Sequence, residues 1–262
     1  MKSLSIAATG MLAQQRNVEV ISNNIANLNT VGYKRQRAEF QDLLYQTLER
    51  AGAISSATGT VTPNGVQIGA GVKTGSVYRI AEQGNVTATG NDYDLAISGR
   101  GLFRVLLPDG TEAYTRAGNF AASADGRIVT EDGYEVLPGV TVPEEAVDIS
   151  ISKDGIVEAR VAGEQNLREL GRLELVTFFN ESGLEAIGGN LLLETAASGE
   201  PVIGNPGDPG FGAILQGFIE TSNVDPVQEI TALIAAQRAY EMNARVIETS
   251  DEMLATNANL RR

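Results

Sequence analysis

Apolar residues recur every seven positions at both ends of the chain. Near the N-terminus the repeat runs through Leu4, Met11, Val18 and Ile25, with Ala7, Gln14, Ile21 and Leu28 three residues further on. Near the C-terminus it runs through Leu233, Tyr240, Ile247 and Leu254, with Ile230, Gln237, Ala244 and Ala258 interleaved. A seven-residue repeat lays a narrow apolar seam along a helix, and such a seam needs a partner helix. The pattern predicts one helix over about 3–29 and another over about 225–259.

Two kinds of partner fit these seams. The helices of other subunits can cover them, which makes the chain part of an assembly. Alternatively, amphipathic end helices can pack on the rest of their own chain. Because the chain leaves the first helix and returns to the last, the two helices are also able to lie side by side and antiparallel.

Local signals predict where these helices begin and end. Ser3 is a candidate N-cap of the first helix, and Gly32 can take the positive φ that terminates it. Asp225 is the expected N-cap of the last helix, Pro226 its first residue, and Glu229 an acidic residue of its first turn. Four asparagines sit near the end of the first helix, namely Asn23, Asn24, Asn27 and Asn29. Their amides either fix the register of the seam or mark a fraying helix end.

The residues that follow the first helix carry a weaker pattern. The spacing of Phe40, Leu43, Leu44 and Leu48 predicts a short second helix within 33–50. Residues 51–75 are small and polar, which is typical of a flexible linker or of an extended arm ordered against neighbours. The basic cluster Lys34, Arg35 and Arg37 is too small for a nucleic-acid patch and is interpreted as a subunit contact or a solvated face.

The middle of the chain, about 77–203, alternates short β-runs with turns. The runs are 102–107, 128–129, 147–151, 156–161 and 173–179, and Asp-Gly pairs at 109, 125, 132 and 154 predict tight turns between them. The expected fold class is therefore α+β, with an antiparallel β-domain inserted between long terminal helices that pair in a coiled-coil-like, antiparallel manner. The expected division is 1–30 with 225–262 as a helical domain, 31–76 with 204–224 as a connecting region, and 77–203 as the β-rich domain.

The amino-acid composition excludes several kinds of catalytic and structural chemistry. The chain has 262 residues, a net charge of −13, no His and no Cys. Histidine bases, thiolate nucleophiles and disulfides are therefore excluded. The acidic middle argues against nucleic-acid binding, and no apolar run is long enough to span a bilayer. The first residues resemble an amphipathic helix more than a cleaved signal peptide.

Candidate catalytic and ligand sites are weak. Asp92 with Asp94, and Glu131 with Asp132, are carboxylate pairs, but a sugar-cleaving cleft also needs stacking aromatics and Trp is absent. Residues 125–135 lack the alternating oxygen ligands of a calcium loop, and the glycines of 69–75 do not form a phosphate loop. We expect no catalytic residue, no metal and no cofactor. A glycan-binding or hydrolytic β-domain is the alternative from another class.

Three stretches resemble a known family. IAATGMLAQQRNVEVISNNIANLNTVGYKRQRAEFQDLL (6–44) and GFIETSNVDPVQEITALIAAQRAYEMNARVIETSDEMLATNANL (217–260) resemble the terminal motifs of bacterial flagellar rod and hook proteins. DYDLAISGRGLFRVLLPDGTEAYTRAGNF (92–120) resembles their β-domain. Length and residues 43–72 are most similar to the members that build the distal part of the rod. Hook and proximal rod subunits are the alternatives within the family.

The resemblance implies a structural, non-enzymatic subunit. Such proteins leave the cell through the flagellar type III export apparatus without a cleaved signal and polymerise helically into a hollow shaft that transmits torque to the hook. The implied partners are copies of the chain itself, proximal rod proteins below, the hook protein above, surrounding ring proteins that act as a bushing, and a rod cap during assembly. The implied location is the flagellar basal body, where the rod spans the periplasm to the outer membrane. Residues 45–63 resemble the stretch that is tied to a straight, stiff rod.

The expected assembly residues fall into two sets. The subunit-packing seams are Leu4, Met11, Val18, Ile21, Ile25, Leu28, Ile230, Leu233, Tyr240, Ala244, Ile247 and Leu254. The family motif residues are Asn23, Asn24, Asn27, Asn29, Gly32, Tyr33, Asn223, Asp225, Pro226, Gln237, Arg238 and Tyr240.

Overall fold

A computed structural model describes residues 2–50, 52, 64–161 and 167–260. These residues form two compact units, each described by itself. The described residues within 1–25, 36–78 and 226–262 form the helical unit, and those within 26–35 and 79–225 form the β-rich unit. Of the expected connecting region, residues 36–76 therefore group with the terminal helices, whereas 204–224 lie in the β-rich unit.

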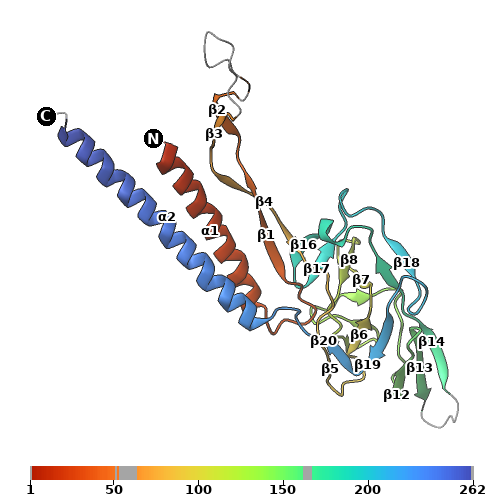
Figure 1. Cartoon of the computed structure of the whole chain (residues 1–262). Helices are drawn as coiled ribbons and strands as arrows, with labels where there is room; N and C mark the ends of the chain where they lie inside the picture. The colour runs from red at the N-terminus through yellow and green to blue at the C-terminus, as the bar shows by residue number, and fades with distance from the viewer. Residues whose placement is uncertain (1, 51, 53–63, 162–166, 261–262) are drawn as a thin grey trace. The chain divides into compact units, whose positions relative to one another are not determined.

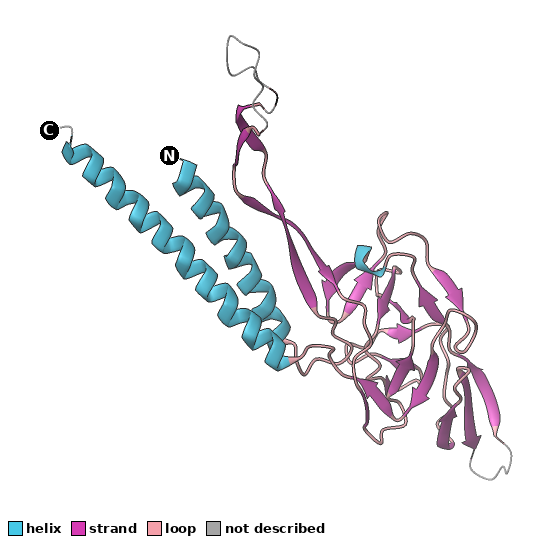
Figure 2. Cartoon of the chain, in the orientation of Figure 1, coloured by secondary structure: helices cyan, strands magenta, loops and turns pink. Residues whose placement is uncertain are grey.

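Long helices occur at both ends of the chain and strands fill the residues between them (Figures 1 and 2). Helix α1 spans Lys2–Ala26 and helix α2 spans Pro226–Leu260. The expected start of the last helix at Pro226 is confirmed. The first helix ends earlier than predicted, because residues 27–29 form a turn in which the N–H of Thr30 bonds to the carbonyl of Asn27 at 3.2 Å. Ser3 lies inside α1, so its predicted role as N-cap is wrong.

The second helix predicted within 33–50 does not form. Strands β1 (Gln36–Asp42) and β2 (Tyr45–Glu49) occupy these residues instead. Strand β1 pairs with β4 (Val72–Arg79), and β2 pairs in antiparallel fashion with β3 (Val66–Gly69). Pairing with distant strands outweighs the weak helical spacing, because helix propensity is only a weak local preference. Residues 51 and 53–63, about half of the predicted linker 51–75, lie outside the described part.

The β-rich unit consists of short strands and one 3₁₀ turn. The strands are β5 (Val86–Ala88), β6 (Leu95–Ser98), β7 (Leu102–Leu106), β8 (Glu112–Thr115), β9 (Ala121–Ala122), β10 (Ile128–Val129), β11 (Glu135–Val136), β12 (Ala146–Ile151), β13 (Ile156–Val161), β14 (Arg168–Arg172), β15 (Leu175–Thr177), β16 (Glu185–Gly188), β17 (Leu191–Leu193), β18 (Val202–Gly204), β19 (Ala213–Gln216) and β20 (Phe218–Glu220), and the 3₁₀ turn η1 is Glu181–Gly183. The predicted β-runs coincide with β7, β10, β12, β13 and β15. The α+β fold class is thereby confirmed.

Antiparallel pairing organises this unit. The main sheet has the order β16-β17-β8-β7-β11-β10-β9, and β15 joins it through β7 and also pairs with β18. Strands β12, β13 and β14 form a separate meander, β19 pairs with β6, and β20 pairs with β5. The glycines of all four Asp-Gly pairs have positive φ, between +76° and +85°, as the turn prediction required.

The core of this unit follows from strand alternation. Leu95, Phe103, Val105, Val157 and Leu175 are at most 1% exposed and belong to one cluster. The Phe103 and Phe120 rings pack edge to face at 5.0 Å. Tyr114 and Phe178 pack likewise at 4.8 Å in a second cluster, where burial raises the pKa of Tyr114 to about 12. The β-rich unit thus has a hydrophobic core of its own.

None of the helices in the described part of the chain is long and apolar enough to cross a membrane. Within 2–50, 52, 64–161 and 167–260 no group of His, Cys, Asp and Glu side chains is placed to hold a metal ion.

Candidate functional site

The predicted seam residues are mostly half-buried. Ile21 is buried, and Ile230 and Tyr240 are exposed by 51% and 43%. The half-buried members are Leu4, Met11, Val18, Ile25, Leu28, Leu233, Ala244, Ile247 and Leu254. Leu28 lies beyond the end of α1 and belongs to the β-rich unit. A single chain therefore covers the apolar stripes only in part, and their role in subunit packing stays a prediction.

Asn24 joins three segments of the helical unit. Its Nδ2 donates to the carbonyl of Gln36 at 2.8 Å, and its Oδ1 accepts from the N–H of Gln36 at 2.9 Å. The same Nδ2 donates to Oε2 of Glu229 at 3.1 Å. Asn24 and Glu229 are each 1% exposed. The amide thus ties the end of α1 to the start of β1 and to the first turn of α2, which favours the register interpretation of Asn24 over fraying.

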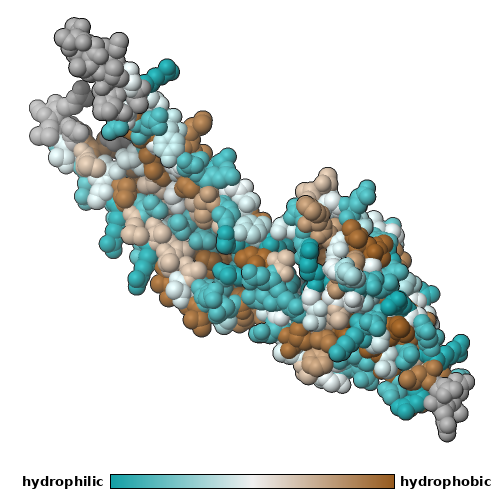
Figure 3. All heavy atoms as spheres, turned by 45° about the vertical axis from the view of Figure 1, so that its right-hand side comes forward, coloured by the Kyte–Doolittle hydropathy of each residue, from teal (hydrophilic) through white to brown (hydrophobic). Residues whose placement is uncertain are grey.

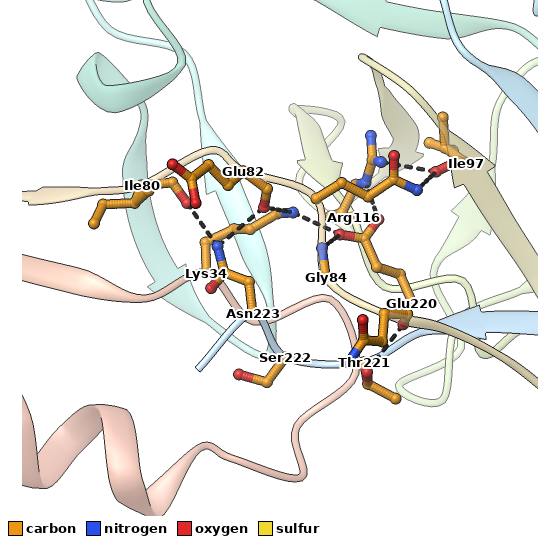
Figure 4. Close-up of polar contacts among 12 residues, drawn as sticks. Lys34, Ile80, Glu82, Gly84, Ile97, Arg116, Glu220, Thr221, Ser222 and Asn223 are labelled. Carbon is orange, nitrogen blue, oxygen red and sulfur yellow. Dashed lines mark hydrogen bonds and ion pairs between the residues drawn. The ribbon is translucent and has the colours of Figure 1, made fainter. Parts of the chain in front are cut away.

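Asn223 makes an analogous clamp in the β-rich unit (Figure 4). Its Oδ1 accepts from the N–H of Arg35 at 2.7 Å, and its Nδ2 donates to the carbonyls of Ile80 and Glu82, both at 3.0 Å. Asn223 holds Arg35 whereas Asn24 holds Gln36, and the boundary between the units falls between these neighbours. The two motif asparagines therefore hold two consecutive residues of the chain, Asn223 on the side of the β-rich unit and Asn24 on the side of the helical unit.

A buried ion cluster lies next to Asn223 (Figure 4). Oε2 of Glu220 accepts from Nε of Arg116 at 2.6 Å, and its Oε1 accepts from Nζ of Lys34 at 2.6 Å and from the N–H of Gly84 at 2.9 Å. The side chains of Glu220 and Arg116 are 1% and 7% exposed, and that of Lys34 is 15% exposed. Lys34 is thus an internal ion-pair partner, so its interpretation as a subunit contact or solvated face is wrong.

Arg116 distributes its remaining donors over backbone carbonyls. Its Nη2 donates to Ile97 at 2.8 Å and to Gly99 at 2.7 Å, and its Nη1 donates to Gly101. A buried charge is tolerated only when it is paired and fully hydrogen-bonded. The guanidinium therefore links β20 to the turn between β6 and β7.

The protonation of this cluster follows from its surroundings. Burial raises the pKa of Glu220, but the charge of Arg116, the hydrogen bond from Lys34 and the N–H of Gly84 outweigh it, so the pKa lies below its ordinary value of 4.5. Burial lowers the pKa of Lys34 more than Glu220 raises it. Glu220 is therefore a carboxylate at neutral pH and keeps Arg116 compensated.

Two glycines allow the backbone to reach this cluster. Gly32, a motif residue, has φ +68°, and a Cβ there would lie 2.6 Å from the nitrogen of Ala117. Its N–H donates to the carbonyl of Glu220 at 2.8 Å. At Gly84 a Cβ would lie 2.0 Å from the carbonyl oxygen of Thr221. A side chain at either position would separate segments that the ion cluster holds together.

The other motif residues remain on the surface of their units. Tyr33 and Asn27 are half-buried, and the exposed ones are Asn23, Asn29, Asp225, Pro226, Gln237, Arg238 and Tyr240. Their roles stay predictions.

Of the carboxylate pairs considered as catalytic candidates, one member, Asp94, has a structural role. Asp94 is 8% exposed and accepts from Nδ2 of Asn91 at 3.0 Å and from the hydroxyl of Thr89. Asp94 therefore stabilises a turn, whereas Asp92, Glu131 and Asp132 are exposed. This arrangement does not resemble a pair of catalytic carboxylates facing a substrate.

The start of β4 lies against α1 within the helical unit. The N–H of Val72 donates to the hydroxyl of Thr9 at 3.3 Å, and a Cβ at Gly71 would lie 2.2 Å from the same hydroxyl. A groove of about 330 Å³ lies there, lined by Thr9, Leu12, Ala13, Gln15, Arg16, Glu19, Val72, Lys73 and Thr74. The start of β4 is thereby docked on the first helix.

Sequence reasoning missed the ion cluster. Glu220, Arg116 and Gly84 are far apart along the chain, and none stands in a recognisable spacing. Pairing over such separations appears only when the strands are assembled.

Known proteins resemble the chain over its whole length. Residues 4–34 match the family "Flagella basal body rod protein", 96–159 match "Flagellar hook protein FlgE/F/G D1 domain", and 215–260 match "Flagellar basal body rod FlgEFG protein C-terminal". The flagellar basal-body rod protein FlgG of Caulobacter vibrioides is 61% identical over 261 residues, covering 100% of both chains. The FlgG protein of Agrobacterium fabrum is 53% identical and covers 97% of both. The hook protein FlgE2 of Helicobacter pylori is 15% identical over 71% of this chain and 43% of its own, with a TM-score of 0.25.

The architecture and the matches define a class of structural protein, the subunits of the flagellar rod and hook. Within that class the chain belongs to the family of flagellar basal-body rod proteins. The resemblance expected from the terminal motifs is confirmed, and the chain is a structural component of the bacterial flagellar basal body.

Proposed function

We propose that this structural component of the flagellar rod polymerises helically into the rigid, hollow distal rod, which transmits torque from the motor to the hook. The observation that carries the proposal is the 61% identity to a FlgG rod protein over the full length of both chains. The subunit acts by packing and has no catalytic role.

The surface of the helical unit supports assembly. Apolar side chains remain at the surface among polar ones (Figure 3). On the helices the exposed large apolar residues are Leu12, Val227, Ile230, Ile234, Tyr240, Met242, Val246 and Met253. Burying a side chain of this size stabilises a contact by roughly 1.5–3 kcal/mol. Helices of neighbouring copies would cover these positions together with the half-buried seams.

The strand pair β2–β3 offers a second assembly surface. Every residue of β2 is exposed, and Leu44, Tyr45, Leu48, Val66 and Ile68 are between 37% and 88% exposed. An exposed apolar strand pair invites pairing with other chains. We propose that this arm, with residues 45–63, packs on neighbouring subunits and makes the rod straight and stiff.

The proposed partners follow from membership of the rod family. They are copies of the chain itself, proximal rod proteins, the hook protein, ring proteins around the rod, the rod cap and the type III export apparatus. The proposed position spans the periplasm, and export occurs without a cleaved signal. The absence of Cys suits a chain that is threaded through a channel and cannot form disulfides on the way.

Electron microscopy of the purified full-length chain tests the proposal. We expect tubular helical polymers with both termini at the inner radius. A chain that stays monomeric at high concentration, or polymers with the β-rich unit at the inner radius, would contradict it.

Deleting residues 45–63 should convert straight polymers into curved or flexible ones, because the arm contacts that lock neighbours together are lost. The measurement is the persistence length of negatively stained polymers. Replacing Leu44 and Leu48 with Ser should act in the same direction, whereas Thr47→Ser on the same arm should not. Deletion polymers as straight as those of the unaltered chain would rule out the stiffening role.

A further inference from the structure

The contacts between α1 and α2 follow a seven-residue ladder that is not the apolar stripe. Oγ of Ser3 lies 3.5 Å from Oγ of Ser250. At Gly10, a Cβ would lie 3.0 Å from the side-chain amide atoms of Asn243. At the far end Asn24 donates to Glu229 at 3.1 Å.

These contacts share one register. From Ser3 to Gly10 is seven residues, as is the step back from Ser250 to Asn243. From Gly10 to Asn24 is fourteen, as from Asn243 to Glu229. The same register pairs Asn17 with Ala236 between these contacts, and Ala236 is only 3% exposed. The residues of these three contact pairs are therefore small or polar, while the stripe 4-11-18-25 of α1 lies one residue further along.

We infer that this small and polar ladder, 3-10-17-24 against 250-243-236-229, is the interface that sets the antiparallel register of α1 and α2 within one chain. The inference does not depend on the proposed polymer. A repeating apolar stripe specifies register poorly, because every heptad offers an equivalent surface, whereas a few polar positions in a seam specify it well. The apolar stripes are thereby left for other contacts.

The paired residues differ in chemistry from one heptad to the next, and this difference makes the register of the two helices specific. A shift by one heptad moves the helices about 10.5 Å along each other. In either direction the shift separates the amide of Asn24 from the buried carboxylate of Glu229, and a buried polar group that loses its partner is costly. A shift also removes Asn243 from Gly10, where the missing side chain leaves room for the amide. The observed register alone satisfies all the contacts together.

Paired cysteines test the register, and the natural chain contains no Cys to interfere. Ser3→Cys with Ser250→Cys, and Asn17→Cys with Ala236→Cys, should form disulfides within one chain under mild oxidation at concentrations where the chain is monomeric. The matched control, Ser3→Cys with Asn243→Cys, is one heptad out of register and should stay reduced. Non-reducing electrophoresis and mass spectrometry separate internal bridges from dimers.

The same assay tests Gly10. Gly10→Leu in the Ser3→Cys, Ser250→Cys background should lower the yield of the internal disulfide about tenfold, because the new side chain overlaps the amide of Asn243. Adding Asn243→Ala should restore most of the disulfide yield, because the smaller alanine on α2 leaves room for the leucine side chain on α1. The inference is overturned if the control pair forms a bridge as readily as the in-register pairs, if neither in-register pair forms one, if only dimers appear, or if Gly10→Leu has no effect.

Discussion

Glu220→Gln should destabilise the β-rich unit by about 3–5 kcal/mol, because it leaves the buried charges of Arg116 and Lys34 without their carboxylate. Folded domains are stable by only about 5–15 kcal/mol, so this loss is a large share of the total. The measurement is denaturant unfolding of the full chain, followed by the near-UV signal of the tyrosines.

The matched control is Asp148→Asn. Asp148 pairs with Arg160, and the two side chains are 50% and 52% exposed. Removal of a charge from an exposed pair changes stability by about 0–1 kcal/mol. Equal losses in the two variants would show that the Glu220 cluster contributes no more than a surface ion pair.

The loss of stability in Glu220→Gln should also depend on pH. The pKa of Glu220 in the folded chain lies below its ordinary value of 4.5. A group with a lowered pKa stabilises the fold fully above its unfolded value and loses that contribution as the pH falls through the folded value. The stability difference between the natural chain and Glu220→Gln should therefore be constant from neutral pH down to about 4.5 and shrink below it. A difference that grows on acidification would contradict the assigned charge state.

Asn24→Asp should destabilise the helical unit by about 3–4 kcal/mol near neutral pH. The aspartate cannot donate to the carbonyl of Gln36, and it places a second carboxylate about 3 Å from Glu229, where two ionised groups repel each other strongly. Stability should recover partly on acidification, since one proton shared by the pair removes the repulsion. Thermal unfolding monitored by far-UV circular dichroism measures both effects.

Gln15→Glu is the control on the same helix. The side chain of Gln15 is exposed and donates to Glu19 at 3.3 Å, so the change also creates a pair of like charges. On a helix surface such a pair costs only about 0.2–0.5 kcal/mol. If Asn24→Asp costs no more than Gln15→Glu, then Asn24 is not the clamp of the helical unit.

The local patterns predicted much of the fold. Heptad spacing and the Asp-Pro start placed both helices, and strand alternation with Asp-Gly pairs placed the turns, because these signals depend on neighbours in sequence. The prediction failed within 33–50. There the choice between helix and strand was made by pairing of β1 with β4 and of β2 with β3, which local spacing does not contain.

Some residues of the candidate site were likewise expected from the sequence, and others were not. Asn24, Asn223 and Gly32 were expected from the terminal motifs, and each has a defined contact. Glu220 and Arg116 were not expected, since residues 104 positions apart carry no local sign of their pairing. Glu229 was expected only as an acidic residue of the first turn of α2, although its carboxylate accepts a buried amide.

By itself the sequence determined that the ends are helices with seams, that the middle is a β-structure without histidine or cysteine chemistry, and that the termini resemble rod and hook proteins. Periodicity and composition suffice for the first two conclusions, and the residues of the terminal motifs carry the resemblance. Only the tertiary structure decided which face of each helix meets the other, and it selected the small and polar ladder and left the apolar stripes half-covered. That choice depends on how closely two backbones approach and on which buried polar groups find partners, and both are set by residues more than 200 positions apart.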